Sequence, residues 1–478
     1  MKAPSMREIK GGYIDGQWTV SAASGRIDVT NPATGRVIGR APLGCEDDVA
    51  RAVAAARSAF DGWAMRPVAE RIAMLRRVRE GFAVRGEEMA TLITEQMGTP
   101  IGFSKAAQIG LPLRNFDVTL AAMEGIAGEE VTLGRSSIVR DPVGVVAAIT
   151  PWNFPLHQIV AKVVPALLAG CTVVLKPSEL TPFDAAVFAE VLHDAGLPAG
   201  VFNLIFGGAR TGAGLVEHRD VDMISFTGST RAGRSIGAVA GGNLKKVSLE
   251  LGGKSANILL DDVDFEKVVP AVLGQCFVNA GQTCAALTRL IVPAPHRERV
   301  EQLAARFIEA WQPCDPSRPD TPMGPLASLA QQARVKRKVE VALIEGARIV
   351  AGGGELPDSL AAGAYMTPVV LSDVRPDMEI VREEVFGPVL CILAHEGDED
   401  AVRLANDSEY GLSGGVWSAS EERAMAVARR MRTGQVVLNG AMLDLEAPFG
   451  GVKQSGLGRE YGRHGIEEFF NLKAITRP

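Results

Sequence analysis

The sequence predicts an α/β protein in which helices cover parallel sheets and the chain is divided between two domains. Short β-branched runs alternate with helical patterns from Val143 to Gly252, and the alternation resumes in the C-terminal half. Strands and helices that alternate in this way form parallel sheets. The chain of 478 residues also exceeds the roughly 250–300 residues that one hydrophobic core can serve, so two or more domains are expected.

The N-terminal half is expected to open with short strands and turns, at 11–18 and 31–35, and to continue with helices. From 46 to 97 the apolar residues recur every three or four positions, which is the period of an amphipathic helix. Four apolar runs, each ended by turn residues, then predict the strands of the first sheet. These runs are GVVAAIT from Gly144, VFNLIF from Val201, TVVLKP from Thr172 and MISFTG from Met223.

The C-terminal half carries the same alternation after Gly252. Helices are expected at 265–279, 297–311 and 421–431, and strands near 368–371 and 389–393. Two segments fit neither domain: 130–141, which has the pattern of an exposed hairpin, and the tail after Ser455. Such segments can pair with another subunit, although a plain surface ribbon fits them almost as well.

Charge and composition exclude several classes of protein. The net charge is −6, without a basic stripe, so nucleic acid is not an expected partner. No apolar run approaches the ~18–20 residues of a membrane span, and the first residues lack the core of a secretory signal. We therefore expect a cytoplasmic protein with no membrane partner. The six cysteines form no CxxC pair and no zinc-ligand pattern, so we expect no disulfide and no metal. We expect the five cysteines other than Cys284 to be small, buried apolar residues.

One strand end carries a base and an acid that suit a ribose. Lys176 and Glu179 follow the run at 172–176, at the edge where open α/β sheets bind ligands. A carboxylate at the ribose repels a 2′-phosphate, which favours NAD over NADP. The same residues fit a helix-starting turn with solvated charges equally well.

A second strand end, in FTGSTRAGRSIG, has the pattern of a phosphate-binding turn. Gly228 and Gly233 stand around the expected helix start, where backbone N–H groups can face a pyrophosphate. It is not the G-x-G-x-x-G fingerprint, and a plain turn with Ser229 or Thr230 as the helix N-cap fits as well.

Two residues are candidates for the chemistry. Glu250 is the only acid in VSLELGGKSANIL, and burial among apolar neighbours would raise its pKa into the range of a general base. A salt bridge to Lys245, Lys246 or Lys254 is the alternative. Cys284 follows a Gly-Gln-Thr turn, and a helix beginning there would stabilise its thiolate.

Seven segments resemble, in order, the signature segments of the aldehyde dehydrogenase superfamily, and together they span most of the chain. They are PWNFP (151–155), KPSE (176–179), FTGST (226–230), LELGGK (249–254), GQTC (281–284), EEVFGPV (383–389) and PFGGVKQSGLGREYG (448–462). The resemblance implies a Rossmann-like NAD-binding domain at 1–122 and 143–252 and a second, catalytic α/β domain at 253–454. It also implies a β-ribbon oligomerisation arm from 123–142 and 455–478, and hence a homodimer or homotetramer.

The resemblance further implies NAD-dependent oxidation of an aldehyde to a carboxylic acid. Cys284 matches the nucleophile that forms a thiohemiacetal and then a thioester, and Glu250 matches the base that activates the hydrolytic water. Asn153 matches the oxyanion-hole residue, together with the backbone N–H of Cys284. The cofactor contacts it implies are Thr150, Trp152, Lys176, Ser178, Glu179, Gly208, Gly228, Ser229, Gly233, Leu251, Glu384 and Phe386.

The substrate tunnel departs from common family patterns. Leu287 is bulky, whereas Ala161 and Leu443 stand where relatives often place a large aromatic residue. We expect a wide, apolar tunnel and a medium to large apolar aldehyde, either aromatic, branched or terpenoid. Arg114 could instead bind an acidic semialdehyde at the tunnel mouth. The expected tunnel residues are Phe154, Gln158, Ala161, Thr283, Ala285, Leu443 and Phe449.

Two other classes of function share some of these residues. A cysteine hydrolase would use the thiol and the carboxylate but would need no dinucleotide, which the ribose-contact residues Lys176, Glu179 and Glu384 argue against. A binding protein without catalysis would have no use for Asn153 and Glu250 beside Cys284. Within the family, the members that form acyl-CoA generally lack the hydrolytic glutamate, so Glu250 favours the acid-forming type.

Overall fold

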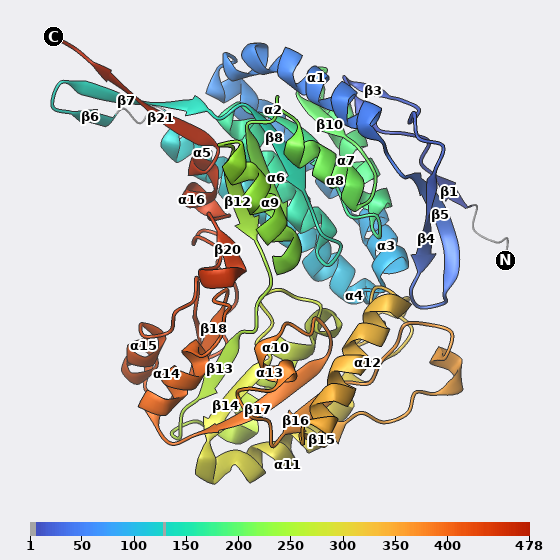
Figure 1. Ribbon diagram of the computed structural model, residues 1–478, viewed down its shortest axis with the longest axis vertical. Helices are drawn as coiled ribbons and strands as arrows, with labels where there is room; N and C mark the ends of the chain where they lie inside the picture. Colours follow the sequence, from blue (N-terminus) through green and yellow to red (C-terminus); the bar gives the residue numbers. More distant parts are fainter. Residues whose placement is uncertain (1–5, 128–130) are drawn as a thin grey trace.

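The computed structural model describes residues 6–127 and 131–478, and its strands form two large sheets and two small ones (Figure 1). Five neighbouring strands of the first large sheet are parallel, and the predicted runs supply four of them. The eight strands in order are β20 (Gly456–Leu457), β12 (Lys246–Glu250), β11 (Met223–Thr227), β8 (Val145–Ile149), β9 (Thr172–Lys176), β10 (Phe202–Leu204), β2 (Tyr13–Ile14) and β3 (Gln17–Trp18).

Helices cover both faces of this sheet because alternate strand residues point to opposite sides. Two hydrophobic clusters lie on the two faces of the sheet. In β8, Val145 and Ala147 belong to the first cluster, and Val146 and Ala148 belong to the second. The first cluster includes α1 (Glu46–Ala64), α8 (Ala209–Glu217) and α9 (Thr230–Gly242). The second includes α2 (Val68–Val84), α3 (Gly86–Met97), α5 (Gly110–Ile126), α6 (Pro155–Ala169) and α7 (Pro182–Asp194). The helices predicted for 46–97 are thus confirmed.

The second large sheet begins with β13, six residues along from the end of β12, so the chain changes sheets between Glu250 and Ala256. Its seven strands in order are β15 (Arg348–Gly352), β16 (Val369–Ser372), β17 (Val389–His395), β14 (Arg289–Pro293), β13 (Ala256–Leu259), β18 (Gly414–Trp417) and β19 (Val437–Leu438). The helices packed on it include α10 (Phe265–Phe277), α11 (Arg297–Phe307), α12 (Leu329–Ile344), α14 (Asp398–Asn406) and α15 (Glu421–Ala428).

The predicted helices of this half are present but end earlier than expected. The helix expected over 265–279 stops at Phe277, because Asn279 and Ala280 adopt positive φ angles of 55° and 54°. The helix expected over 297–311 ends at Phe307 and continues as a 3₁₀ turn, Ile308–Trp311. The helix expected over 421–431 ends at Ala428.

The two segments that fitted neither domain come together in space. β7 (Ser136–Pro142) pairs with β6 (Val131–Leu133) as a hairpin and with β21 (Phe470–Thr476), and this arm projects from the body (Figure 1). The hairpin prediction is confirmed for 131–141, and its first residue, Glu130, lies outside the described residues. The second small sheet, separate from the arm, joins β1 (Arg7–Glu8), β5 (Arg36–Pro42) and β4 (Arg26–Asn31).

The prediction for the tail is wrong at one point. Gly456 and Leu457 do not stay outside the domains, because they form β20 and pair with Glu250 and Leu249 of β12. A Cβ on Gly456 would come within 1.9 Å of the Leu249 carbonyl oxygen, so this edge pairing requires glycine.

The structure also bears on the predictions about cysteines, metals and membranes. All six cysteines are free, but Cys45 and Cys314 are half-buried, so the prediction of five buried thiols is wrong for these two. Cys45 stays near the surface because it caps the start of α1 and its thiol donates to Asp48. Within the described ranges, no His, Cys, Asp and Glu side chains gather in a group able to hold a metal ion. No helix in those ranges has both the length and the hydropathy of a membrane span.

Candidate active site

Cys284 lies between two cavities and lines both of them. One, of about 250 Å³, is bordered by Asn153, Glu384 and Phe386. The other, of about 260 Å³, is bordered mainly by apolar and aromatic side chains, including Phe449 and Leu443. A thiol in this position can meet one ligand from each side.

The turn that delivers Cys284 is left-handed over three consecutive residues. Asn279, Ala280 and Gly281 have φ angles of 55°, 54° and 71°, a conformation that costs a residue such as alanine on the order of 1–3 kcal/mol. Hydrogen bonds hold it: Thr99 Oγ1 donates to Asn279 Oδ1 at 3.1 Å, and Gln282 Nε2 donates to the Asn279 carbonyl at 3.1 Å. The strained turn therefore fixes where the nucleophile stands.

No helix begins at Cys284, so the predicted stabilisation of its thiolate by a helix N-terminus is wrong. The residues from Thr283 form a turn that leads into β14 instead. Burial, with Glu250 and Glu384 nearby, raises the pKa of the thiol to about 12, and a hydrogen bond from the Ala285 N–H opposes this rise. The resting thiol is therefore protonated at neutral pH and needs a base before it can attack.

Asn153 is anchored against the same turn. Its side-chain amide donates to the backbone carbonyl of Gln282 at 3.1 Å. The backbone carbonyl of Asn153 accepts from Gln108 Nε2 at 2.9 Å and from Asn279 Nδ2 at 3.0 Å. One amide N–H of Asn153 remains available, and the residue borders the cavity at Cys284. This arrangement can donate a hydrogen bond to a developing oxyanion.

Glu250 ends β12 as a buried carboxyl without a hydrogen bond to either oxygen among the described residues. The predicted alternative of a salt bridge is wrong: Lys245 and Lys246 donate to backbone carbonyls, and Lys254 does not pair with it. Burial, then the neighbouring Glu460, raises the pKa of Glu250 well above its usual value. A carboxyl in this state can act as a base near neutral pH.

A buried ion pair beside Glu250 was missed by the sequence reasoning. Lys162 of α6 and Glu460 pair with side chains that are only 1% and 4% exposed. Lys162 lowers the pKa of Glu250 while Glu460 raises it. One signal was available, because Lys162 is the lone charge in the apolar helix PLHQIVAKVVPALLA and a buried lysine requires a partner.

A groove of about 540 Å³ opens at the carboxyl ends of β8, β9 and β11. Its polar end carries Lys176 and Glu179, and its walls include Val216 of α8 with Ile236 and Val239 of α9. The predicted residues Thr150, Trp152, Ser178, Gly228 and Ser229 also line it.

The groove residues keep donors and acceptors for a ligand. Lys176 Nζ donates to the carbonyls of Pro177 and Gly207 at 2.8 and 2.7 Å, which leaves one donor of the ammonium group. Burial lowers the pKa of Lys176 to about 8. Ser229 is the N-cap of α9 and its side chain accepts from the Ala232 N–H. This agrees with the alternative of a plain turn with Ser229 as the helix N-cap.

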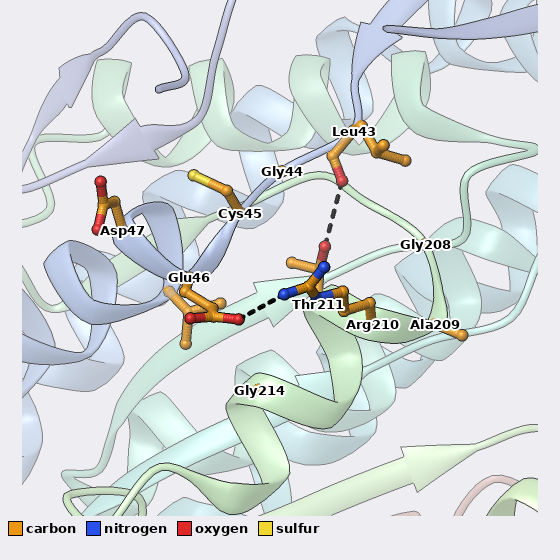
Figure 2. Close-up of a pocket in the computed structure, with 11 residues that line it drawn as sticks. Leu43, Gly44, Cys45, Glu46, Asp47, Gly208, Ala209, Arg210, Thr211 and Gly214 are labelled. Carbon is orange, nitrogen blue, oxygen red and sulfur yellow. Dashed lines mark hydrogen bonds and ion pairs between the residues drawn. The ribbon is translucent and has the colours of Figure 1, made fainter. Parts of the chain in front are cut away.

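Two predicted cofactor residues line neither this groove nor the cavity beside it. Gly233 packs against Leu251, where a Cβ would come within 2.3 Å of Cδ2, so it permits close contact between α9 and the residue that follows β12. Gly208 borders a separate hollow between the starts of α1 and α8, where Glu46 and Arg210 form an ion pair (Figure 2).

The cavity on the groove side of Cys284 contains Leu251, Glu384 and Phe386, as predicted. The Phe386 ring meets Trp152 edge to face at 5.3 Å, and Glu384 Oε1 accepts from the Gly253 N–H at 3.2 Å. Burial raises the pKa of Glu384 to about 7. Sequence reasoning missed α12, which brings Gln331 and Arg334 to this cavity.

Six of the seven predicted tunnel residues line the other cavity: Phe154, Gln158, Thr283, Ala285, Leu443 and Phe449. Ala161 does not, because it is buried in a cluster with Phe449 and Tyr461. Leu287 lines the cavity wall, whereas Arg114 is exposed and is not among the lining residues. Sequence reasoning missed His157 and Tyr461, which also line it.

Comparison with known proteins identifies the family. The Aldehyde dehydrogenase family profile matches residues 18–475. A 3-succinoylsemialdehyde-pyridine dehydrogenase from a Pseudomonas species is 46% identical, covering 98% of this chain and 99% of that protein. A geranial dehydrogenase from Castellaniella defragrans is 41% identical, covering 97% of this chain and 98% of that protein. The crystal structure of an aldehyde dehydrogenase C mutant from Pseudomonas syringae, with NAD⁺ and octanal, matches at 44% identity and a TM-score of 0.96, covering 99% and 97%.

The chain therefore belongs to the aldehyde dehydrogenase family. The predicted family and the predicted fold class, with two α/β units and a β-ribbon arm, are confirmed. The alternatives of a cysteine hydrolase and of a binding protein without catalysis are set aside.

Proposed function

We propose that this enzyme oxidises medium to large apolar aldehydes to carboxylic acids with NAD, using Cys284, Glu250 and Asn153. The observation that carries the proposal is the position of Cys284 between two cavities. One of them adjoins the groove of about 540 Å³, and the other is apolar. Asn153 borders the first cavity, and Glu250 is close enough to Cys284 to raise the pKa of its thiol.

The residues of the groove fit NAD. Val216, Ile236 and Val239 offer an apolar slot for an adenine, and the spare donor of Lys176 and the exposed carboxylate of Glu179 suit the ribose hydroxyls. Glu384 would accept from the second ribose, beside the Trp152–Phe386 pair. When bound there, NAD supplies the hydride acceptor for the oxidation.

The chain's own residues then divide the work. The sulfur of Cys284, once deprotonated, bonds to the aldehyde carbon, and the free amide N–H of Asn153 donates to the oxygen that becomes negative. Loss of a hydride, which is two electrons and a proton, from the carbon of this thiohemiacetal anion gives the thioester. Glu250 takes a proton from water as the water oxygen bonds to the acyl carbon, and the C–S bond breaks to release the acid and Cys284.

The lining of the cavity supports the proposed substrate class. Leu111, Phe154, Leu287, Leu443 and Phe449 are apolar, and no Lys or Arg is among its lining residues. Burial of each fitting methylene is worth about 0.8 kcal/mol, so binding should strengthen with apolar size until the cavity is full. The names of the two relatives, which refer to a pyridine semialdehyde and to geranial, agree with substrates of this size.

A panel of aldehydes tests the proposal through the absorbance of the reduced cofactor. Octanal, geranial and benzaldehyde should give higher kcat/KM values than acetaldehyde and succinic semialdehyde. A preference for succinic semialdehyde would instead support the alternative of an acidic substrate held by Arg114. No NAD reduction with any member of the panel would overturn the proposal as a whole.

We also propose the domain division at 1–122 with 143–252, 253–454, and 123–142 with 455–478, where β20 of the last segment joins the first large sheet. We further propose a homodimer or homotetramer assembled through the arm, in the cytoplasm. Leu133, Leu472 and Ile475 of the arm are exposed apolar side chains, which supports contact with another subunit. Light scattering of the wild type and of a variant without residues 470–478 tests the role of the arm in assembly.

A further inference from the structure

Tyr461 enters the apolar cavity from the C-terminal segment. It lines that cavity with Phe449, His157 and Cys284, immediately before α16 (Gly462–Glu467). Its backbone has a φ angle of 68°, which a bulky residue adopts only where its surroundings impose it. Something other than local preference therefore holds the ring in place.

His157 of α6 provides that hold. Its Nε2 atom and the Tyr461 hydroxyl are 2.7 Å apart, and the residue is only 4% exposed, with no partner for Nδ1 among the described residues. Burial, and then the charge of Lys162, lowers the pKa of His157 to about 4. The imidazole is therefore neutral at physiological pH, and within the described part of the chain the only side-chain hydrogen bond of its ring is the one to Tyr461.

Phe449 fixes the ring from the other side. The centroids of Phe449 and Tyr461 are 5.0 Å apart, with their planes inclined by 34°. The backbones beside them are paired as well: the Phe449 N–H donates to the Glu460 carbonyl at 2.8 Å and the Glu460 N–H donates to the Phe449 carbonyl at 2.7 Å. Ala161 belongs to the same cluster, and its small side chain leaves room for both rings.

We propose that Tyr461 is a specificity-determining residue, that His157 is the residue that positions it, and that the cavity prefers flat aldehydes, aromatic or conjugated, over saturated ones of equal carbon number. This inference rests on the proposed function and narrows its substrate class. Rings that are already fixed lose no rotamer freedom on binding. A planar group can contact them along its whole face, whereas a puckered ring leaves gaps that forfeit dispersion energy.

The test compares phenylacetaldehyde with cyclohexylacetaldehyde, which have the same carbon skeleton, by the ratio of their kcat/KM values with NAD. Aromatic pairs contribute ~0.5–1.5 kcal/mol, which corresponds to a change of about two- to tenfold. Tyr461→Leu should lower the ratio by this factor. His157→Leu and Tyr461→Phe should each lower it in part, and the double variant no further, since both remove the same bond.

A matched control and the choice of readout separate this role from general damage. His296→Leu is the matched control, because His296 also stacks on an aromatic ring, Phe265, at 4.8 Å, but outside the cavity. It should leave the ratio unchanged. The readout is the ratio of the two kcat/KM values within each variant, because general damage to the site lowers both values together and leaves their ratio unchanged.

An unchanged ratio in Tyr461→Leu would overturn the inference. Should that variant not fold, an unchanged ratio in both His157→Leu and Tyr461→Phe would overturn it equally. These outcomes leave the proposed function intact, whereas a wild type that oxidises neither aldehyde with NAD refutes the proposed function itself.

Discussion

Replacement of Glu250 by glutamine should separate the two halves of the proposed reaction. Neither carboxyl oxygen has a hydrogen-bond partner among residues 6–127 and 131–478, so the amide fills the same space without breaking a bond seen there. Glu460 and Glu468 disfavour a charge at this position while Lys162 and Arg459 favour it, so its removal should change the stability little. A general base contributes roughly 10²- to 10⁴-fold, and steady-state turnover should fall by that factor because the thioester is no longer hydrolysed.

The assay is stopped-flow absorbance of the reduced cofactor with enzyme and NAD premixed. We expect a burst close to one equivalent per active site, followed by the slow steady state. Glu399→Gln is the control, since Glu399 is an exposed carboxylate paired with Arg430, and it should behave as the wild type. A missing burst with NAD binding intact would refute this division of labour and make Glu250 the base that deprotonates Cys284.

Three further changes follow from the same geometry. Cys284→Ser should abolish turnover while isothermal titration still detects NAD, because the serine hydroxyl is a much weaker nucleophile; measurable turnover would contradict the mechanism. Glu179→Ala should raise the kcat/KM with NADP relative to NAD, and an unchanged ratio would locate cofactor choice elsewhere. Ala161→Trp should lower the midpoint of thermal unfolding, since overpacking a buried cluster costs about 1–3 kcal/mol. A folded variant of wild-type stability would show that the cluster can rearrange to accommodate the larger side chain. For the wild type, kcat should rise with pH as Glu250, whose pKa is raised, loses its proton; a rate flat with pH would argue against a base limiting deacylation.

The parallel strands could be predicted because their sequence signals are local. Each run, such as 145–149 and 223–227, is apolar on both faces and ends in turn residues, as a strand covered by helices on both sides requires. The groove residues Lys176 and Glu179 could be placed for the same reason, because a strand end fixes which edge of the sheet they occupy.

The turn before Cys284 could not be predicted from local preference. Asn279 tolerates a positive φ, but Ala280 does not favour one, and contacts with Thr99 and Gln282 impose it. A helix at Cys284 was a reasonable expectation from the sequence, and the tertiary contacts of the turn prevented it.

Contacts between distant parts of the chain were equally hidden. Lys162 and Glu460 are separated by 298 positions, and His157 and Tyr461 by 304. Loop-closing contacts of this kind leave no periodic signal. The prediction for Ala161 was wrong for this reason, because no local pattern indicates that rings from the C-terminal segment occupy the space beside it.

One C-terminal segment supplies three separate parts of the site. β20 pairs with β12 at Glu250, Glu460 adjusts the pKa of that carboxyl, and Tyr461 forms a wall of the apolar cavity. The same segment then runs into β21 of the arm. Each part depends on the register of β20 on β12. A one-residue insertion between Gly456 and Glu460 would therefore displace both Glu460, which lies near Glu250, and Tyr461, which lines the apolar cavity. The chemistry at Cys284 and the choice of aldehyde are thus linked through the path of a single stretch of backbone.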